Sequence, residues 1–239
     1  MTEQNGSFFV DSVSCSYLPE QQSRLEYRFV ATLTADEYCE LVNLGWRRFG
    51  HLLFRPRCVG CVGCRSLRVV AADFRPNRSQ GRVLKSNLDL EISISRPEFD
   101  AERLRLYGEF HDVRSQQKGW PREREADFDH YLESFMIGPL PILEIAYRLE
   151  GKLLGIGLFD ELPDGLSAIY CFYAPEAQKR GLGTFNVLTG VRETQRRGLP
   201  FLHLGYFVVG CSSLEYKANF MPHQTLDHQT AQWSAAIVR

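Results

Sequence analysis

The order of hydrophobic segments and turns in the second half of the chain restricts the folds open to it. Three strand-like segments follow one another, separated by tight turns at Gly151 and Gly165, and a helix and a fourth strand come after them. The expected strands are Ile142–Leu149, Lys152–Leu162, Leu166–Tyr173 and Phe201–Val208, with a loop at Ala174–Arg180 and a helix over Gly181–Arg197. This order predicts an α+β domain.

The same order is typical of an acyl-transferase core of the N-acetyltransferase type, a GNAT-like core. A glycine turn at the start of the long helix fits this interpretation, because the segment from Gln178 to Gly183 has the QxxGxG pattern of coenzyme A pyrophosphate sites. Glycines there let backbone N–H groups approach an anion at the positive end of the helix. Gln178, Arg180, Gly181 and Gly183 are therefore candidate binding residues. The alternative is an ordinary helix start with two turn glycines.

The first part of the chain has a different composition, rich in arginine and cysteine. We therefore expect a cysteine- and arginine-rich subdomain at residues 1–97 and a GNAT-like domain at 98–239. A capping box at Thr34–Glu37 predicts the start of a short helix. The other expected elements are a strand over Leu84–Ser95 and helices over Asp100–Gln117 and Glu125–Met136.

The overall composition is that of an ordinary globular protein. Of the 239 residues, 44% are hydrophobic and 24% are charged, and the net charge is −1. A disordered chain and a coiled coil are excluded, and no global basic field draws the protein to nucleic acid. The sequence lacks a run of eighteen apolar residues, and its N-terminus lacks the pattern of a secretory signal. We expect a cytoplasmic protein that does not bind membranes.

Three cysteines lie within seven residues, in the order Cys58, Cys61, Cys64. This spacing lets sulfurs converge on one ion, and Cys15 is the best candidate for a fourth ligand by residue type. Thiolates alone suit zinc or an iron–sulfur cluster. The alternative is a group of reduced cysteines without metal. The remaining cysteines are expected to pack in the core, and they are Cys39, Cys171 and Cys211.

Basic residues are concentrated between Arg47 and Lys85. This stretch has ten arginines and lysines and one acid, Asp73, so its net charge is +9 in a chain of net charge −1. Arginine matches the geometry of phosphate, so the block predicts contact with phosphate or RNA. The alternative is a solvated basic face that pairs with acidic helices. Nothing in the sequence indicates the reading of base identity, and DNA is not an expected partner.

A lysine between aromatic residues lies near the C-terminal end. Tyr216 and Lys217 follow the last predicted strand, where Lys217 could anchor a carboxylate or could lie on the surface. The six histidines form no Ser/His/Asp order or metal-binding spacing, so a histidine-based triad is not expected.

Across residues 15–225 the chain resembles the aminoacyl-tRNA–protein transferases of the N-end rule pathway. It is most similar to the short bacterial branch, the aspartate/glutamate leucyltransferases, which are related to eukaryotic arginyltransferase. The matching segments are Cys15–Pro19, Gly45–Gly50, Phe54–Pro56 with the three cysteines, Phe74–Gln80, Cys171–Tyr173, Gly181–Gly183, Leu204–Tyr206 and Tyr216–Pro222. The cysteine segment and Arg78-Ser79-Gln80 are the most specific of these.

The resemblance implies transfer of leucine from leucyl-tRNA to the α-amine of proteins that begin with Asp or Glu, which marks them for degradation. The reaction is aminolysis of an activated ester, so it implies no required cofactor. The implied substrate-binding residues are Arg47, Arg48, Arg78, Ser79, Gln80, Arg82, Gln178, Arg180, Gly181, Gly183 and Tyr216. Arg78, Arg82 and Lys217 are candidates for the acceptor carboxylate, and Tyr170, Tyr173 or a water for the amine proton.

Three alternatives remain. Arginine could be the donor amino acid within the same family, because a leucine pocket needs only apolar walls. An acetyl-coenzyme A-dependent N-acetyltransferase would explain the glycine turn but not the cysteines or the basic block. A non-enzymatic RNA-binding module would explain only the first part of the chain.

Overall fold

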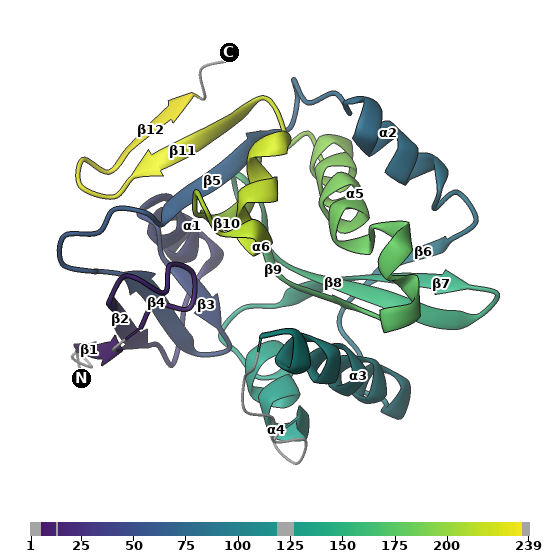
Figure 1. The fold of residues 1–239 in the computed structure, drawn as a ribbon, viewed down its shortest axis with the longest axis horizontal. Helices are drawn as coiled ribbons and strands as arrows, with labels where there is room; N and C mark the ends of the chain where they lie inside the picture. The colour runs from purple at the N-terminus through teal and green to yellow at the C-terminus, as the bar shows by residue number, and fades with distance from the viewer. Residues whose placement is uncertain (1–5, 13, 119–126, 236–239) are drawn as a thin grey trace.

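An eight-stranded sheet forms the centre of the molecule (Figure 1). In this computed structural model, which describes residues 6–12, 14–118 and 127–235, its strand order is β12-β11-β5-β10-β9-β8-β7-β6. The strands are β5 (Arg65–Val70), β6 (Glu91–Ser95), β7 (Ile142–Leu149), β8 (Lys152–Leu162), β9 (Gly165–Tyr173), β10 (Phe201–Phe207), β11 (His223–Asp227) and β12 (Gln232–Ala235). We refer to it as the large sheet.

Helices cover both faces of the large sheet. Figure 1 shows α5 (Leu182–Arg196) and α3 (Ala101–Lys118) on opposite sides of it, and both helices contact β9. Because both faces are covered, β8 and β9 have nearly continuous apolar sequences, with Phe159, Leu166 and Phe172 fully buried. The short α4 (Asp127–Tyr131) and a π-helical turn, η2 (Leu132–Met136), follow α3.

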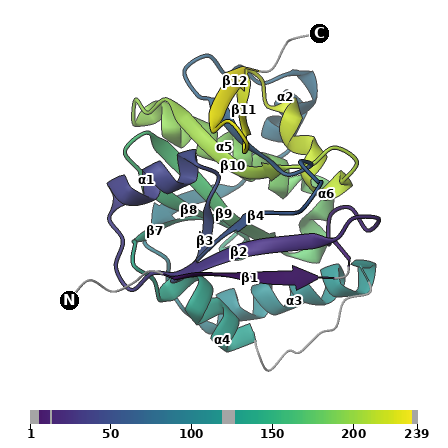
Figure 2. The same ribbon diagram turned by 90° about the vertical axis from the view of Figure 1, so that its left-hand side faces the viewer.

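A second, four-stranded sheet has the order β1-β2-β4-β3 and lies to one side (Figure 2). Its strands are β1 (Ser7–Ser12), β2 (Ser23–Phe29), β3 (Arg47–Phe49) and β4 (Leu52–Pro56). One face packs with α1 (Ala35–Asn43) and with Leu162 of β8, around Trp46 and Leu53. We refer to it as the small sheet.

The predicted strand–strand–strand–helix–strand order is confirmed. β7, β8 and β9 form an antiparallel meander, α5 follows, and β10 returns parallel to β9. The predicted capping box is confirmed as well, because the Thr34 side chain accepts a hydrogen bond from the Glu37 backbone N–H at the start of α1. The predicted loop before α5 instead contains a 3₁₀ turn, η3 (Pro175–Arg180).

The strand expected over Leu84–Ser95 is wrong in its first half. Residues up to Lys85 belong to a helix, α2 (Arg78–Lys85), and only β6 is a strand. Asn77 explains the difference, because its side chain accepts from the Gln80 backbone N–H while the Gln80 side chain accepts from the Asn77 backbone N–H. The helix that this capping box starts includes Leu84 and Lys85. Leu88 and Leu90, whose alternation indicated a strand, lie between α2 and β6.

The predicted helix over Asp100–Gln117 corresponds to α3. The predicted helix that starts at Glu125 corresponds to α4 and η2, although Glu125 itself lies outside the described residues. The large sheet crosses the expected boundary at residue 97, because β5 and β6 come from the first part of the chain. None of the described helices is both long and apolar enough to cross a membrane.

Candidate active site

Two neighbouring parallel strands separate in the middle of the large sheet. β9 and β10 pair only where Gly165–Ser167 faces Phe201–His203, and beyond these positions β10 continues with β5 alone. A register shift after His203 and the positive φ of Gly205, 72°, accompany this divergence. Ligand sites in open sheets lie at the carboxyl ends of parallel strands, and a cavity of 380 Å³ lies in this place.

Segments far apart in the sequence form the walls of this cavity. They are the 16–17 segment, the small sheet, α3, β9, α5, β10 and the residues of α6 (Ser212–Glu215) and η4 (Tyr216–Asn219). The apolar part of the wall includes Phe49, Phe54, Phe110, Ile169, Leu204 and Leu214. A branched aliphatic side chain is therefore compatible with this lining.

Arg47 lies at the point where the two strands part. Its guanidinium donates to Ser167 Oγ at 2.9 Å and to the carbonyl of Ala168, so it bridges β3 and β9. The residue is 8% exposed. Arg47 therefore lies in the cavity wall, where its hydrogen bonds hold the small sheet against β9. Its role in substrate binding stays a prediction.

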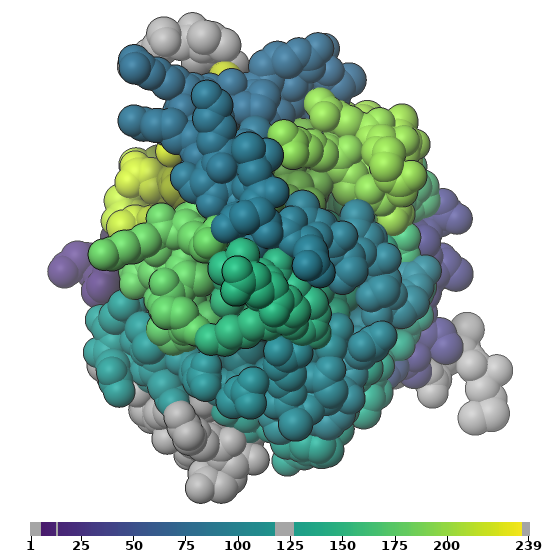
Figure 3. All heavy atoms as spheres, turned by 90° about the vertical axis from the view of Figure 1, so that its right-hand side faces the viewer, coloured from purple at the N-terminus to yellow at the C-terminus, as the bar shows by residue number. Residues whose placement is uncertain are grey.

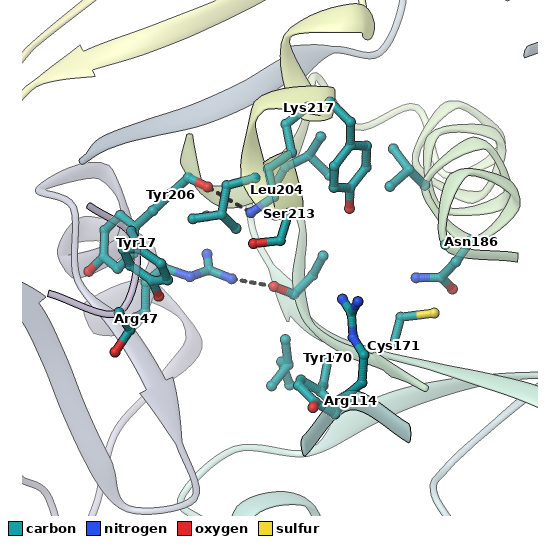
Figure 4. Close-up of a pocket in the computed structure, with 18 of the residues that line it drawn as sticks. Tyr17, Arg47, Arg114, Tyr170, Cys171, Asn186, Leu204, Tyr206, Ser213 and Lys217 are labelled. Carbon is teal, nitrogen blue, oxygen red and sulfur yellow. Dashed lines mark hydrogen bonds between the residues drawn. The ribbon is translucent and has the colours of Figure 1, made fainter. Parts of the chain in front are cut away.

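Lys217 reaches the same space from η4 (Figure 4). Its Nζ donates to the carbonyl oxygen of Tyr206 at 2.7 Å. Burial, and secondarily the positive charge of Arg47, lower the pKa of Lys217 to about 7. Lys217 therefore lies in the cavity wall and not on the open surface, and its contact with a carboxylate stays a prediction.

Arg114 of α3 is the third cation of the cavity. Figure 4 shows the side chains of Arg47, Arg114 and Lys217 entering the space from three sides. Among the described residues that line it there is no Asp or Glu. Three cations without a carboxylate favour an anionic ligand. Arg114 was not predicted from the sequence, because no motif marks it and its place at the cavity depends on the packing of α3 against β9.

Tyr170 and Cys171 of β9 line the cavity, together with Tyr216. The hydroxyl of Tyr170 is 3.2 Å from Nε2 of His111, and burial raises the pKa of Tyr170 above its ordinary value. A tyrosine with a raised pKa stays protonated near neutrality and donates a hydrogen bond. The position of Cys171 departs from the expected core packing, because it is only partly buried and faces the cavity.

The glycine turn lies beside this cavity rather than across it. Gly183 lines the cavity, whereas Gly181 packs near Val83 of α2. Arg180 pairs with Asp89 at 2.8 and 2.9 Å, and Gln178 is exposed. Tyr173 is not among the lining residues but packs on Phe110, with ring centroids 5.2 Å apart.

The residues of the Arg78-Ser79-Gln80 segment do not line the cavity. Arg78, Ser79 and Arg82 lie exposed on α2, and Gln80 is buried with its amide donating to the carbonyl of Asn219. Since Asn219 belongs to η4, Gln80 supports the segment that carries Lys217. The structure therefore gives Gln80 a positioning contact.

Arg48 requires a correction, because it is not at the surface. Its guanidinium donates to Asp160 of β8 and its side chain is 1% exposed, as is that of Asp160. A buried ion pair of this kind leaves no face of Arg48 for a phosphate. The alternating pattern of β3 places the side chains of Arg47 and Arg48 on opposite faces, so only Arg47 meets the cavity.

The cysteines of the predicted metal site gather near the small sheet. Cys58, Cys61 and Cys64 line a separate cavity of 440 Å³, and His228 lines it too. Cys15 is not part of that lining, although its thiolate is among the charges that raise the pKa of Cys64 after the larger effect of burial. Within the described ranges, no three His, Cys, Asp or Glu side chains are placed to hold a metal ion.

The lowered pKa of Lys217 predicts a dependence of stability on pH. Between pH 7 and the ordinary lysine value of 10.5, the unfolded chain binds a proton that the folded protein does not. The free energy of unfolding should therefore rise with pH across this interval. Denaturant unfolding at pH 7 and pH 9 should show this rise for the native protein and a smaller one for Lys217→Met. An identical rise in both proteins would contradict the lowered pKa of Lys217.

Gly205 predicts a second effect at the same place. A Cβ atom there would lie 3.2 Å from Nε of Arg47, and the positive φ disfavours any L side chain. Gly205→Ala should lower the free energy of unfolding by about 1–2 kcal/mol and should also lower activity, because Arg47 must move. Gly81→Ala is the matched control: it meets no atom within 4 Å and lies inside α2, so it should be neutral or stabilising.

The comparisons with known proteins define the class to which the chain belongs. Residues 102–227 match the family described as "Arginine-tRNA-protein transferase, C terminus", and residues 13–82 match its N-terminal counterpart. These matches identify an aminoacyl-tRNA–protein transferase, an acyl-transferring enzyme. The chain belongs to the arginine-tRNA-protein transferase family.

Bacterial relatives that the chain matches carry the name aspartate/glutamate leucyltransferase. The protein from Campylobacter jejuni subsp. jejuni serotype O:6 is 35% identical over 89% of each chain. The protein from Pseudomonas aeruginosa (strain LESB58) is 36% identical over 92% of each. Among solved structures, the C-terminal domain of a putative lysylphosphatidylglycerol synthetase from Agrobacterium fabrum has a TM-score of 0.48, with 13% identity over 82% of this chain and 62% of that one.

Proposed function

We propose that this protein transfers leucine from leucyl-tRNA to the α-amine of proteins that begin with Asp or Glu, and so marks them for N-end rule degradation in the cytoplasm. The observation that carries the proposal is the charge of the cavity. Arg47, Arg114 and Lys217 meet there without a carboxylate among the described lining residues, beside an apolar wall. The names of the relatives support the same donor and acceptors.

The charge pattern suits the two reactants differently. An acidic first residue places its carboxylate among cations, and a neutral residue leaves them without a partner. The leucyl side chain packs against apolar side chains such as Ile169, Leu204 and Leu214. We assign the acceptor carboxylate to Lys217, whose Nζ uses one donor on the carbonyl of Tyr206 and has further N–H groups for a ligand. Arg78 and Arg82, the other candidates, lie on α2 outside the lining.

The chemistry requires no group beyond the two substrates and this cavity. The amine nitrogen attacks the ester carbonyl, an amide bond forms, the bond to the 3′ oxygen of the tRNA breaks, and the amine proton ends on that oxygen. Holding the amine and the ester together supplies much of the rate. Tyr170, kept protonated by burial, donates a hydrogen bond to the developing oxyanion in this scheme, with His111 holding its hydroxyl.

The basic surface of α2 is where we place the body of the tRNA. Arg75, Arg78, Arg82 and Lys85 are exposed there. Figure 3 shows the segment around α2, in blue, on the face seen from the right-hand side of Figure 1, and Figure 1 shows the small sheet on the other side. Phosphate contacts of this kind weaken steeply with salt. Gly183, at the start of α5, joins this surface to the cavity and is our candidate contact for the terminal nucleotide.

A zinc ion or an iron–sulfur cluster at Cys15, Cys58, Cys61 and Cys64 is a further part of the proposal. Four thiols are a suitable donor set, and the sulfurs of Cys58, Cys61 and Cys64 face one cavity without converging. Such a group would hold the loop after β4 to the small sheet and would take no part in the transfer. Metal analysis of the purified protein tests this point: one zinc or a cluster per chain supports it, and metal-free protein with full activity contradicts it.

A donor-exchange assay tests the proposed function. Peptides that begin with Asp, or with the isosteric Asn, are incubated with leucyl-tRNA, arginyl-tRNA or acetyl-coenzyme A, and the products are weighed by mass spectrometry. We expect a leucyl adduct on the Asp peptide only. Arginyl transfer alone would keep the family and change the donor, and acetyl transfer alone would make the protein an N-acetyltransferase.

A further inference from the structure

One face of the small sheet is aromatic and lies partly open. Phe8, Tyr27 and Phe54 occupy facing positions on β1, β2 and β4, and Phe49 of β3 stacks on Phe54. The ring centroids follow one another at 5.5, 6.3 and 5.6 Å. Phe8 is 49% exposed and Phe49 is 38% exposed. We call these four residues the aromatic row.

The charged residues of the same strands point the other way. In β1 and β2 the side chains that alternate with the aromatic row belong to the opposite face. They include every charged residue of these two strands, which are Asp11, Arg24, Glu26 and Arg28. On that face Glu26 pairs with Arg55 at 2.7 Å, and the guanidinium of Arg28 lies over Trp46. The aromatic face is therefore uncharged along β1 and β2.

The aromatic row continues into the candidate active site. Phe49 and Phe54 belong to the cavity wall, together with Arg47 from the same face of β3. Phe8 is at the other end of the row, on the edge strand of the small sheet (Figure 2). With ring-to-ring steps of 5.5 to 6.3 Å, the row spans the length of a few residues of extended chain, each about 3.3 Å long.

We propose that the aromatic row binds the acceptor polypeptide, taking the apolar side chains that directly follow its acidic first residue. The inference rests on the proposed function, which places that first residue in the cavity. Charge decides between a polypeptide and the single-stranded end of the tRNA. Surfaces that bind single-stranded nucleic acid place cations among their aromatic residues, and an uncharged row leaves phosphates without partners. The helix α2, which carries exposed cations, lies on the other side of the molecule (Figure 1).

Phe8 and Phe9 allow a matched test. Both are phenylalanines of β1 with 49% exposure, but they lie on opposite faces, and only Phe8 belongs to the aromatic row. The acceptors are the dipeptide Asp-Ala and an eight-residue peptide with Asp at position 1 and Leu or Phe at positions 2 to 5. Steady-state leucyl transfer is measured for the native protein, Phe8→Ser and Phe9→Ser, with thermal unfolding as the check on folding.

Phe8→Ser should raise KM for the long peptide about fivefold and leave KM for Asp-Ala and for leucyl-tRNA unchanged, because one ring contact is lost. Phe9→Ser should leave all three values unchanged. Equal effects of Phe8→Ser and Phe9→Ser on the long peptide would overturn the inference, and so would a higher KM for leucyl-tRNA with Phe8→Ser alone, which would assign the row to RNA. Absence of leucyl transfer to both acceptors by the native protein would instead refute the proposed function.

Discussion

Lys217→Ala is expected to lower kcat/KM for acceptors that begin with Asp or Glu by about a hundredfold. In the variant, an acidic side chain that enters the cavity no longer forms an ion pair with Lys217. A buried carboxylate without a partner is strongly disfavoured. For acceptors that begin with Ala, kcat/KM should change little, so the ratio of kcat/KM for acidic over neutral N-termini should fall to near one. Steady-state kinetics with matched Asp and Ala peptides measure both values. Lys179→Ala is the control, because Lys179 is exposed on η3 and does not line the cavity.

The pH dependence adds a second readout for the same residue. With a pKa near 7 in the free enzyme, Lys217 is largely neutral at pH 8, and binding of a carboxylate must bring a proton with it. The apparent affinity for acidic acceptors should therefore fall as pH rises above 7, and this fall should be absent in Lys217→Ala. An Asp preference that survives in Lys217→Ala at every pH would assign the carboxylate to Arg47 or Arg114 instead.

Arg48→Met is expected to lower the free energy of unfolding by about 3–5 kcal/mol. The carboxylate of Asp160 is buried in β8, and without Arg48 it has no cation at salt-bridge distance among the described residues. Burial already raises the pKa of Asp160, and the Arg48 guanidinium opposes that rise. A change of this size is a large share of the stability of an ordinary domain. Denaturant unfolding measures it.

Two further variants separate this pair from an ordinary loss of charge. Lys152→Met removes an exposed ion pair with Glu176 at the start of the same strand, and it should have little effect. Replacing both Arg48 and Asp160 by Met should recover much of the lost stability, because neither charge is then left buried. Arg48→Met with unchanged stability and weaker binding of charged tRNA would restore Arg48 to the phosphate contacts expected from sequence.

The fold of the second half could be predicted because the hydrophobic pattern and the turn residues there indicate the same strands that the sheet pairs with one another. β7, β8 and β9 are apolar along their length, and glycine-containing turns mark their ends. In the first part of the chain the signals are weaker. β3 has three residues, and β5 has the sequence Arg-Ser-Leu-Arg-Val-Val, which lacks a clear alternation of polar and apolar residues. Even so, β5 is held in the large sheet between β10 and β11. Only pairing with strands more than a hundred residues away makes β5 a strand.

The site was harder to predict than the fold, because arginines that the sequence does not distinguish have different environments in the structure. Arg47 and Arg48 are neighbours in sequence, yet one meets the cavity and the other pairs with Asp160. Lys217 was a candidate from its aromatic neighbours, whereas Arg114 carried no motif. Its role depends on α3 packing across β9, which no local pattern of the sequence records.

A structure of the protein with an Asp-initiated peptide and a non-hydrolysable leucyl-adenosine analogue tests the central claim most directly. We predict that the Asp side chain lies within salt-bridge distance of Lys217 Nζ in the cavity between β9 and β10, with the leucyl group against Leu204 and Leu214. The peptide amine should face the ester position beside Tyr170. A carboxylate bound instead to Arg78 or Arg82 on α2, with the cavity empty, would contradict the claim.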